Sequence, residues 1–476
     1  MGGAQCLVAV LGLPSGWRAL PDWIGRLPAL TTLELSQCTA LTCVPEWVAQ
    51  MPALTTLKMD DCAQLLFGLP PCVADLGAVT SLSISSGCAL ANRLLLLPES
   101  LGQLTALTVL TLERCHKLTC LPASLGQLSA LTELSLKWCE ALTCLPESLG
   151  QLVVLKLLDI QACSITCLPE SIGQLVSLST LTVTFCSGIL CLPAAVGQLT
   201  ALTTLDVSEC HRLLALPPSL SQLPALKTLC IDNCLLLLVS LNPAIAALPA
   251  LASFRLSTFC NTLALPQSWL PHMPALTTLR CEFYSLVQFP DSVGQQTALT
   301  TLNLDGCTSL TCLPDSVGQL TALTTLTLCR CSQLIGLPES VGQLTALATL
   351  LLSQCTSLAA LPASMGRLTA LTTLDIAYCT HLTLPKFMSQ FLQTNIIVDD
   401  GLTTNSMPAA TWVQAQELNF ANRRLRVLRR RELLLICLGR RRRQPAARYR
   451  LPPELWHLID DMLWHAQSER WRGLTW

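Results

Sequence analysis

The chain has 476 residues, is 51% hydrophobic and only 12% charged, and carries a formal net charge of −1. Its mean hydropathy of +0.51 would suit a membrane protein, but its apolar residues stand in short groups. None of them approaches the roughly 20 consecutive apolar residues that a membrane-spanning helix needs.

Residues 1–26 precede the regular part of the sequence, and we expect them to form an N-terminal cap. The stretch Cys6–Leu13 is mostly apolar, but no basic residues precede it, so it is not typical of a secretory signal peptide. The start Met1-Gly2 resembles a myristoylation signal, which would require Ser or Thr where Cys6 stands. We therefore expect the apolar stretch to cover the open end of the repeats that follow.

Residues 27–392 repeat a unit of about 24 residues. Leu104–Gln127 and Leu128–Gln151 align with leucine, cysteine, proline and glycine in the same register. A fixed period of this length is typical of a solenoid, in which successive units stack. About fifteen copies start at Leu27, Met51, Leu76, Leu104, Leu128, Leu152, Leu175, Leu199, Leu223, Leu248, Met273, Gln296, Leu320, Leu344 and Leu368.

Each position of the unit predicts a local structure. Leu110 and Leu112 alternate with polar residues, which indicates a short strand with these two side chains inward. Pro122 suits the first position of a short helical turn, and Gly126 suits a left-handed residue that ends it. One unit cannot bury its leucines alone, so stacked units should share a continuous core and one parallel sheet.

Twelve cysteines share the position after the strand. We interpret them as reduced thiols inside a cell, each small enough for the corner, with its S–H donated to a backbone carbonyl. Neighbouring copies would lie within the Cα range of a disulfide, but parallel side chains disfavour a bridge. The column comprises Cys38, Cys62, Cys115, Cys139, Cys163, Cys186, Cys210, Cys234, Cys307, Cys331, Cys355 and Cys379.

Metal sites are not expected, because a zinc site needs clustered ligands. The close pair Cys329 and Cys331 should place one side chain outward and the other inward. A second set of cysteines precedes the Leu-Pro step and should be the more reactive one if exposed. This set comprises Cys43, Cys120, Cys144, Cys191 and Cys312.

The segment LTVLTLERCHKL and its copies fit the pattern LxxLxLxxN/CxL, so residues from about 20 to 392 resemble the leucine-rich-repeat family. The cysteine and the trailing LPxxLGxL are similar to repeats of plant disease-resistance receptors and related intracellular Ras-group proteins. The resemblance implies an α/β solenoid: a horseshoe with a parallel concave sheet and short helical or 3-10 segments on the convex side. A resistance-receptor mechanism is not implied, because no nucleotide-binding domain is present.

Sequence variation concentrates just before the cysteine column, on the predicted concave surface. A copied scaffold with one variable stripe is typical of a binding surface, although drift at solvated positions would give the same pattern. Trp138 with Arg114 and Phe185 forms the strongest candidate patch, because interface hot spots are rich in Trp, Tyr and Arg. The candidate partner-binding residues are Arg114, Lys137, Trp138, Phe185, Glu209, Asp232, Phe283, Arg330 and Tyr378.

The sequence changes character after the repeats. Residues 393–419 are predicted to be a cap and linker, and residues 420–476 a small basic helical tail. Residues 1–419 carry 15 basic and 25 acidic side chains, whereas residues 420–476 carry 14 and 5. The arginine runs of residues 423–443 are compatible with a nuclear address, and no groove-reading module that would indicate specific nucleic-acid binding accompanies them.

The last predicted helix, beginning near Pro453, has an apolar stripe with two interpretations. It would cap the last repeat, or it would bind the core of a ubiquitin ligase, because LPPELWHLIDDML resembles the opening of an F-box and Leu433, Cys437 and the Leu-Pro-Pro that follows resemble a SOCS box. The chain ends before an F-box would finish. The stripe consists of Leu455, Leu458, Ile459, Met462 and Leu463.

Catalytic signatures are missing from the sequence: there is no GxSxG, Walker A, HExxH or GxGxxG motif. The six histidines are scattered, and none has a second group for catalysis. We therefore expect a monomeric, non-enzymatic scaffold of the cytoplasm or nucleus, without cofactor, that binds a protein on its concave face. The alternative is a substrate adaptor of a ubiquitin ligase.

Overall fold

The repeated units each form one strand and, in most copies, one 3-10 helix of a continuous array. The computed structural model describes residues 10–12, 19–35, 45–51, 53–60, 77–85, 94–234, 236–237, 245, 248–258, 270, 273–383 and 395–397. The chain divides into two units, Met1–Gln416 and Glu417–Trp476, and the second lies outside the described residues.

Seventeen strands in the described part of the chain form one parallel sheet, and each pairs with the next in sequence order. The register keeps equivalent positions opposite each other, so Leu110 of one repeat pairs with Leu134 of the next. The strands are β1 (Val10–Gly12), β2 (Thr32–Glu34), β3 (Thr56–Asp60), β4 (Ser81–Ser85), β5 (Val109–Glu113), β6 (Glu133–Lys137), β7 (Leu157–Gln161), β8 (Thr180–Thr184), β9 (Thr204–Asp206), β10 (Thr228–Cys230), β11 (Ser253–Thr258), β12 (Thr278–Phe283), β13 (Thr301–Asn303), β14 (Thr325–Thr327), β15 (Thr349–Leu351), β16 (Thr373–Asp375) and β17 (Asn395–Ile397).

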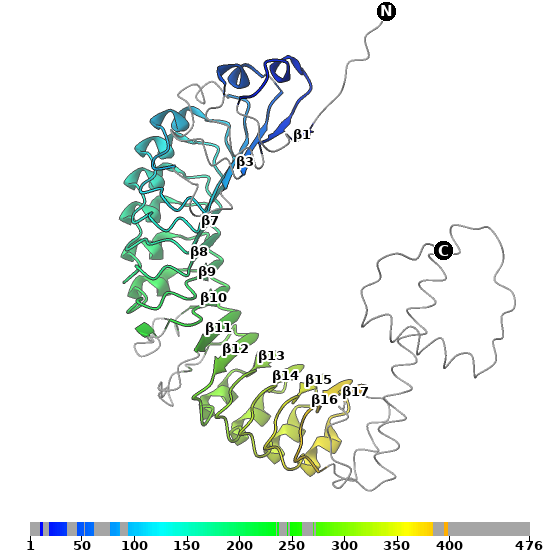
Figure 1. Cartoon of the computed structure of the whole chain (residues 1–476). Helices are drawn as coiled ribbons and strands as arrows, with labels where there is room; N and C mark the ends of the chain where they lie inside the picture. The colour runs from blue at the N-terminus through cyan, green and yellow to red at the C-terminus, as the bar shows by residue number, and fades with distance from the viewer. Residues whose placement is uncertain are drawn as a thin grey trace, which may run out of the picture. The chain divides into compact units, whose positions relative to one another are not determined.

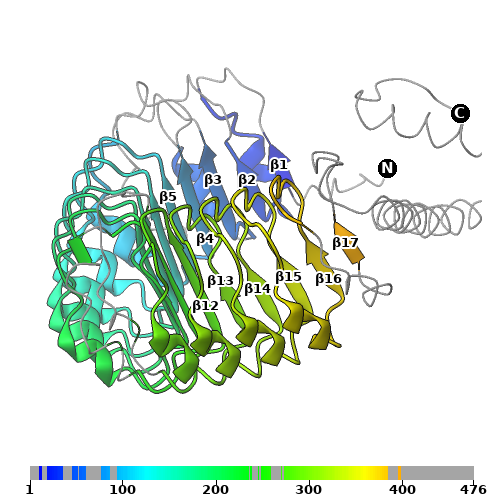
Figure 2. The same cartoon turned by 90° about the horizontal axis from the view of Figure 1, so that it is seen from below.

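Short 3-10 helices lie on the side opposite the strands, and the array of residues 27–383 curves toward its strands (Figures 1 and 2). The strand face is therefore the concave one, as the sequence predicts. The helices are η1 (Ile24–Arg26), η2 (Glu46–Gln50), η4 (Glu99–Gln103), η5 (Ala123–Gln127), η6 (Glu147–Gln151), η7 (Glu170–Gln174), η8 (Ala194–Gln198), η9 (Pro218–Gln222), η11 (Asp291–Gln295), η12 (Asp315–Gln319), η13 (Glu339–Gln343) and η14 (Ala363–Arg367).

The core is a stack of leucine rows between the sheet and the 3-10 helices. Leu110 and Leu112 of β5 are fully buried, as are Leu118 from the following loop and Leu125 from η5. Equivalent leucines of every well-described repeat belong to the same cluster. Burial of a leucine side chain contributes about 1.5–3 kcal/mol, so stacking is what stabilises units too small to fold alone.

The glycine of the repeat has a different role from the one expected. Only Gly306 among the described glycines has a left-handed backbone, with φ of 77°, so the prediction of a left-handed Gly126 is wrong. Gly126 lies within η5, and a Cβ there would stand 2.4 Å from the carbonyl oxygen of Ser148. The position needs glycine because the next repeat packs directly against it. Pro122 is the N-cap of η5, one residue earlier than expected.

Candidate functional site

The outward side of the sheet is formed by alternate residues of each strand. In β5 these are Thr111 and Glu113, while Leu110 and Leu112 point into the core. Many strands are preceded by a threonine whose hydroxyl is already hydrogen-bonded: Thr108 donates to the Thr80 carbonyl at 2.9 Å, and Thr132 donates to the Thr108 carbonyl at 3.0 Å. These threonines therefore tie neighbouring repeats together.

A left-handed residue follows the strand in most repeats. The N–H of Arg114 still donates to the Lys137 carbonyl at 2.7 Å, which continues the ladder before the chain turns and buries the next cysteine. We call this position the stripe. Its non-glycine residues with φ of 52–63° are Arg114, Trp138, Ala162, Phe185, Glu209, Asn233, Arg330, Gln354 and Tyr378.

Backbone geometry thus fixes where the stripe side chains start. A left-handed conformation is uncommon outside glycine, asparagine and aspartate. The sequence pattern did not predict that it would recur at the variable position. The presence of Asn233 and Gly306 at this position was the available signal, because both residue types tolerate positive φ.

The inner cysteines that follow the stripe are buried and donate to carbonyls of the preceding repeat, as predicted. Cys234 Sγ lies 3.0 Å from the Val207 carbonyl oxygen, and Cys210 Sγ lies 3.2 Å from that of Val183. Burial raises the pKa of the Cys234 thiol to about 12. The Cys234 thiol is therefore structural and stays protonated at neutral pH. Cys38 and Cys62 lie outside the described residues.

Five predicted stripe residues are exposed. Trp138, Phe185 and Tyr378 leave 47%, 58% and 52% of their surface open, and the side chains of Arg114 and Arg330 are exposed by 51% and 55%. Three large aromatic side chains are therefore exposed at the same repeat position.

Trp138 and Phe185 lie two repeats apart, with Ala162 between them at the same stripe position. Because Ala162 has only a methyl group, no side chain of comparable size stands between the two aromatic residues. Lys137 lies beside this patch and is one-third exposed, with Nζ 3.0 Å from an Asp159 carboxylate oxygen. The patch therefore joins apolar area with charged groups at its edge.

Two predicted residues are not available on the surface. Phe283 is only 1% exposed, and Asp232 only 4%. β11 and β12 extend one residue further than the five-residue strands, so strand alternation directs Phe283 into the core in place of a left-handed stripe residue. The expectation that Phe283 and Asp232 present their side chains to a partner is wrong.

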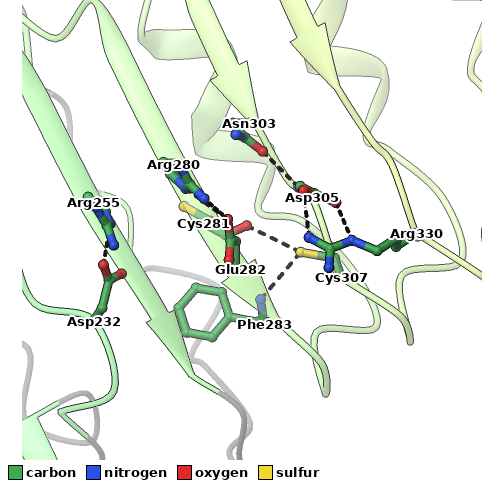
Figure 3. A network of polar contacts seen from close by, with 10 residues as sticks. All are labelled: Asp232, Arg255, Arg280, Cys281, Glu282, Phe283, Asn303, Asp305, Cys307 and Arg330. Atoms are coloured by element: carbon green, nitrogen blue, oxygen red, sulfur yellow. Dashed lines mark hydrogen bonds and ion pairs between the residues drawn. The ribbon is translucent and has the colours of Figure 1, made fainter. Parts of the chain in front are cut away.

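Strands β10 to β14 carry a network of acid–arginine pairs (Figure 3). Arg255 pairs with Asp232, and Arg280 pairs with Glu282. Arg330 makes two hydrogen bonds to Asp305, at 2.9 and 2.7 Å. The carboxylates are largely buried and the arginines about half exposed.

In this network each guanidinium group is paired with a carboxylate of the same protein surface. The Asp305 hydrogen bonds raise the pKa of Arg330 above its usual range, and burial raises that of Asp232. Exposed ion pairs add little stability, so their main effect is to hold side chains in fixed positions. Glu209 is held similarly, by an amide hydrogen bond from Asn233 at 2.6 Å.

No protein-family model matches the chain, and no curated protein matches its sequence. A leucine-rich-repeat protein of Leptospira interrogans is 26% identical, with a TM-score of 0.61 over 83% of this chain and 96% of that chain. This chain is a leucine-rich-repeat solenoid.

A chain from the Drosophila Toll–Spätzle complex is 18% identical to this chain, with a TM-score of 0.59. The match covers 77% of this chain and 51% of that chain, so this chain spans about half of its length. At this identity the likeness concerns the fold.

Some sequence predictions fall beyond the part of the leucine-rich-repeat solenoid that the structure describes. The apolar stripe of the tail, Leu455 to Leu463, is one of them and lies outside the described residues. Over the described ranges no helix is both long and apolar enough to cross a membrane, and no group of three or more potential ligands is placed to hold a metal ion.

The second set of cysteines contains a member that the sequence reasoning omitted. Cys144, Cys191 and Cys312 are exposed, Cys120 is partly exposed, and Cys167 is exposed at the same repeat position. The repeated tetrapeptide Thr-Cys-Leu-Pro around Cys120, Cys144 and Cys167 was the signal for it. Cys43 lies outside the described residues.

Proposed function

We propose that this solenoid recognises a protein through its concave face, with Trp138, Phe185 and Arg114 at the centre of the contact. The observation that carries the proposal is the row of exposed aromatic and arginine side chains on left-handed stripe positions. The Toll–Spätzle complex supports it as an example of the same fold in a complex.

The energetic argument rests on pre-organisation. Binding energy is lost when flexible side chains and loops must be ordered, and the stripe is hydrogen-bonded to the sheet through its backbone N–H groups. An aromatic side chain has few torsions to restrict and a large apolar area to bury. Trp138 and Phe185 are therefore suited to be anchors in a partner's pockets.

Charges around the patch would set its specificity. Arg114 has its Nε 3.8 Å from a Glu113 carboxylate oxygen, and Lys137 pairs with Asp159. A partner must match these fixed pairs or leave charges desolvated, which penalises wrong partners. Glu209, Arg330 and Tyr378 extend the proposed surface along the same stripe.

The test is affinity capture of partners from the source cell, followed by binding measurements with the purified partner. We expect Trp138→Ala to weaken binding at least tenfold, as a hot-spot truncation does. Alanine is compatible with the backbone, because Ala162 already occupies this position with φ of 52°.

The matched control is Val176→Ala, an exposed residue after η7 on the helix side of the array. It should leave binding unchanged. If Trp138→Ala, Arg114→Ala and the wild type bound the partner equally well, the patch would not be part of the binding surface.

A second candidate function rests on the sequence of the tail alone. The similarity of LPPELWHLIDDML to the opening of an F-box supports a role as a ubiquitin-ligase substrate adaptor, acting in the cytoplasm or nucleus. Recovery of ligase-core subunits should then be lost in a Leu455→Asp and Ile459→Asp double variant while concave-face binding persists. Recovery that does not depend on these residues would contradict the adaptor role.

A further inference from the structure

Four consecutive repeats carry a cysteine immediately before the Leu-Pro step. We call Cys120, Cys144, Cys167 and Cys191 the outer thiol column. The last three are exposed, the first is partly exposed, and all four are free thiols. Each follows the stripe residue of its repeat by five or six residues, and the proposed protein recognition does not use them.

The backbone that carries these thiols has the spacing of a parallel sheet. Thr166 donates its N–H to the Thr143 carbonyl at 3.1 Å, which joins the residues directly before Cys144 and Cys167. Parallel bridges pair Leu96 with Cys120 at one end of the column and Cys191 with Ala215 at the other. Cys144 and Cys167 are therefore carried by hydrogen-bonded neighbouring rungs, about 4.8 Å apart and with their side chains leaving in the same direction. We extend this spacing to the pairs Cys120–Cys144 and Cys167–Cys191 because the strands of these repeats keep a constant parallel register.

We infer that the outer thiol column is a binding site for soft monovalent d10 metal ions such as Cu(I), each held between two neighbouring thiolates. A zinc–thiolate bond is about 2.3 Å long, and two metal–sulfur bonds of that length in line would span about 4.6 Å. That span matches the separation of the rungs. Thiolates are the ligand type that selects Cu(I).

The same geometry disfavours the other uses of paired thiols. A disulfide would bring two sulfurs to about 2 Å of each other, which parallel side chains on separate rungs oppose. A tetrahedral ion would need four ligands, and the described residues contain no group of three or more that could hold a metal. A two-coordinate ion needs only one adjacent pair.

The binding step is a ligand exchange without change of oxidation state. Each ion displaces the protons of two thiols and forms two metal–sulfur bonds, so M⁺ and two RSH give [M(SR)₂]⁻ and two H⁺. The threonine hydroxyls nearby are donors for the resulting negative charge: Thr119 Oγ1 and Thr166 Oγ1 each lie 4.0 Å from the sulfur of the following cysteine.

The experiment compares two double variants that each remove two thiols. Cys144→Ser with Cys191→Ser leaves Cys120 and Cys167, which are two rungs or about 9.6 Å apart. Cys120→Ser with Cys191→Ser leaves the adjacent pair Cys144 and Cys167. Each full-length protein is titrated anaerobically with Cu(I) against a chromophoric Cu(I) chelator, and stoichiometry and thiolate-to-copper absorption in the near ultraviolet are recorded.

We expect the wild type to bind two more ions than Cys144→Ser/Cys191→Ser, and the variant that keeps the adjacent pair to bind one more. Cys312→Ser serves as a control for the loss of an isolated thiol. Gln288 and Gly336 occupy the rungs next to Cys312, so this variant should bind the same number of ions as the wild type. Equal stoichiometry in the two double variants, or a loss in Cys312→Ser, would overturn the inference. Unchanged circular dichroism confirms that the variants are folded.

Discussion

Two repeats of the solenoid place a phenylalanine five residues after the first residue of the strand and use it in opposite ways. Phe185 follows the five-residue strand β8, has a left-handed backbone and is 58% exposed. Phe283 ends the six-residue strand β12 and is 1% exposed, with its N–H 3.5 Å from Cys307 Sγ. One backbone conformation decides whether the same side chain joins the core or the binding surface.

The difference shows that burial in this protein is set by the path of the chain after each strand. Where a left-handed residue follows the strand, its side chain is exposed in most repeats, with Asn233 as the buried exception, and the next cysteine turns inward. Where the strand continues, as in β11 and β12, period-two alternation sends Thr258 and Phe283 inward instead. Glycine and cysteine residues show the same contrast between positions packed against a neighbouring repeat and positions at the surface.

Truncation of the two phenylalanines should give the largest contrast. Phe283→Ala removes a buried ring and leaves a cavity, so we expect a loss of about 3–5 kcal/mol in the free energy of unfolding. Phe185→Ala should change it by no more than about 0.5 kcal/mol. Urea denaturation followed by circular dichroism measures both. Similar losses in the two variants would contradict the assignment of Phe185 to the surface.

The glycines offer the next contrast. Gly126→Ala would place a Cβ 2.4 Å from the Ser148 carbonyl oxygen, whereas a Cβ at Gly336 meets nothing within 4 Å. We expect the first substitution to cost about 1–3 kcal/mol, as overpacking does, and the second to stay within about 0.5 kcal/mol. The comparison uses the same denaturation measurement. If Gly126→Ala left the free energy of unfolding unchanged, neighbouring repeats would be able to move apart easily at this position.

The two cysteine columns should differ by less. Cys210→Ala removes a buried thiol and leaves the Val183 carbonyl without its donor, so we expect a cost of about 1–2 kcal/mol. Cys191→Ala, at an exposed position, should remain within about 0.5 kcal/mol. In addition, a thiol reagent should label Cys191 in the folded protein and leave Cys210 unlabelled. Equal labelling would refute the distinction between the columns.

The smallest expected effect concerns pH. The Glu99 carboxylate accepts N–H groups of Ala123 and Ser124 in the next repeat, at 3.2 and 2.8 Å, and the Ser124 hydrogen bond lowers its pKa. Because the folded pKa is depressed, the charged form stabilises the fold above the usual glutamate pKa of about 4.3, and this contribution is lost as pH falls through the folded value.

Glu99→Gln should therefore be slightly less stable than the wild type at pH 7, and the gap should close in acid. The matched control is Glu133→Gln, an exposed glutamate on β6. A gap for Glu99→Gln that is constant between pH 7 and pH 3 would mean that the charge of Glu99 contributes nothing. Thermal unfolding across this pH range measures it.

Much of the candidate site follows from periodicity, and the exceptions have a physical cause. The exposed positions of Arg114, Trp138 and Tyr378 are predictable because these residues fall in the regular register before a cysteine. Phe283 and Asp232 are not, since burial there depends on strand length and on an ion pair with Arg255 from the next repeat. Such effects come from neighbours that no single repeat contains.

The sequence by itself determines the repeat length, the parallel solenoid and the inward leucines and cysteines, because apolar side chains at a fixed period have only one shared interior to enter. Only the tertiary structure decides that Gly126 is required by contact with the next repeat, that the stripe is left-handed, and that four outer thiols stand on successive rungs. These features depend on distances between repeats, and stacking alone sets those distances.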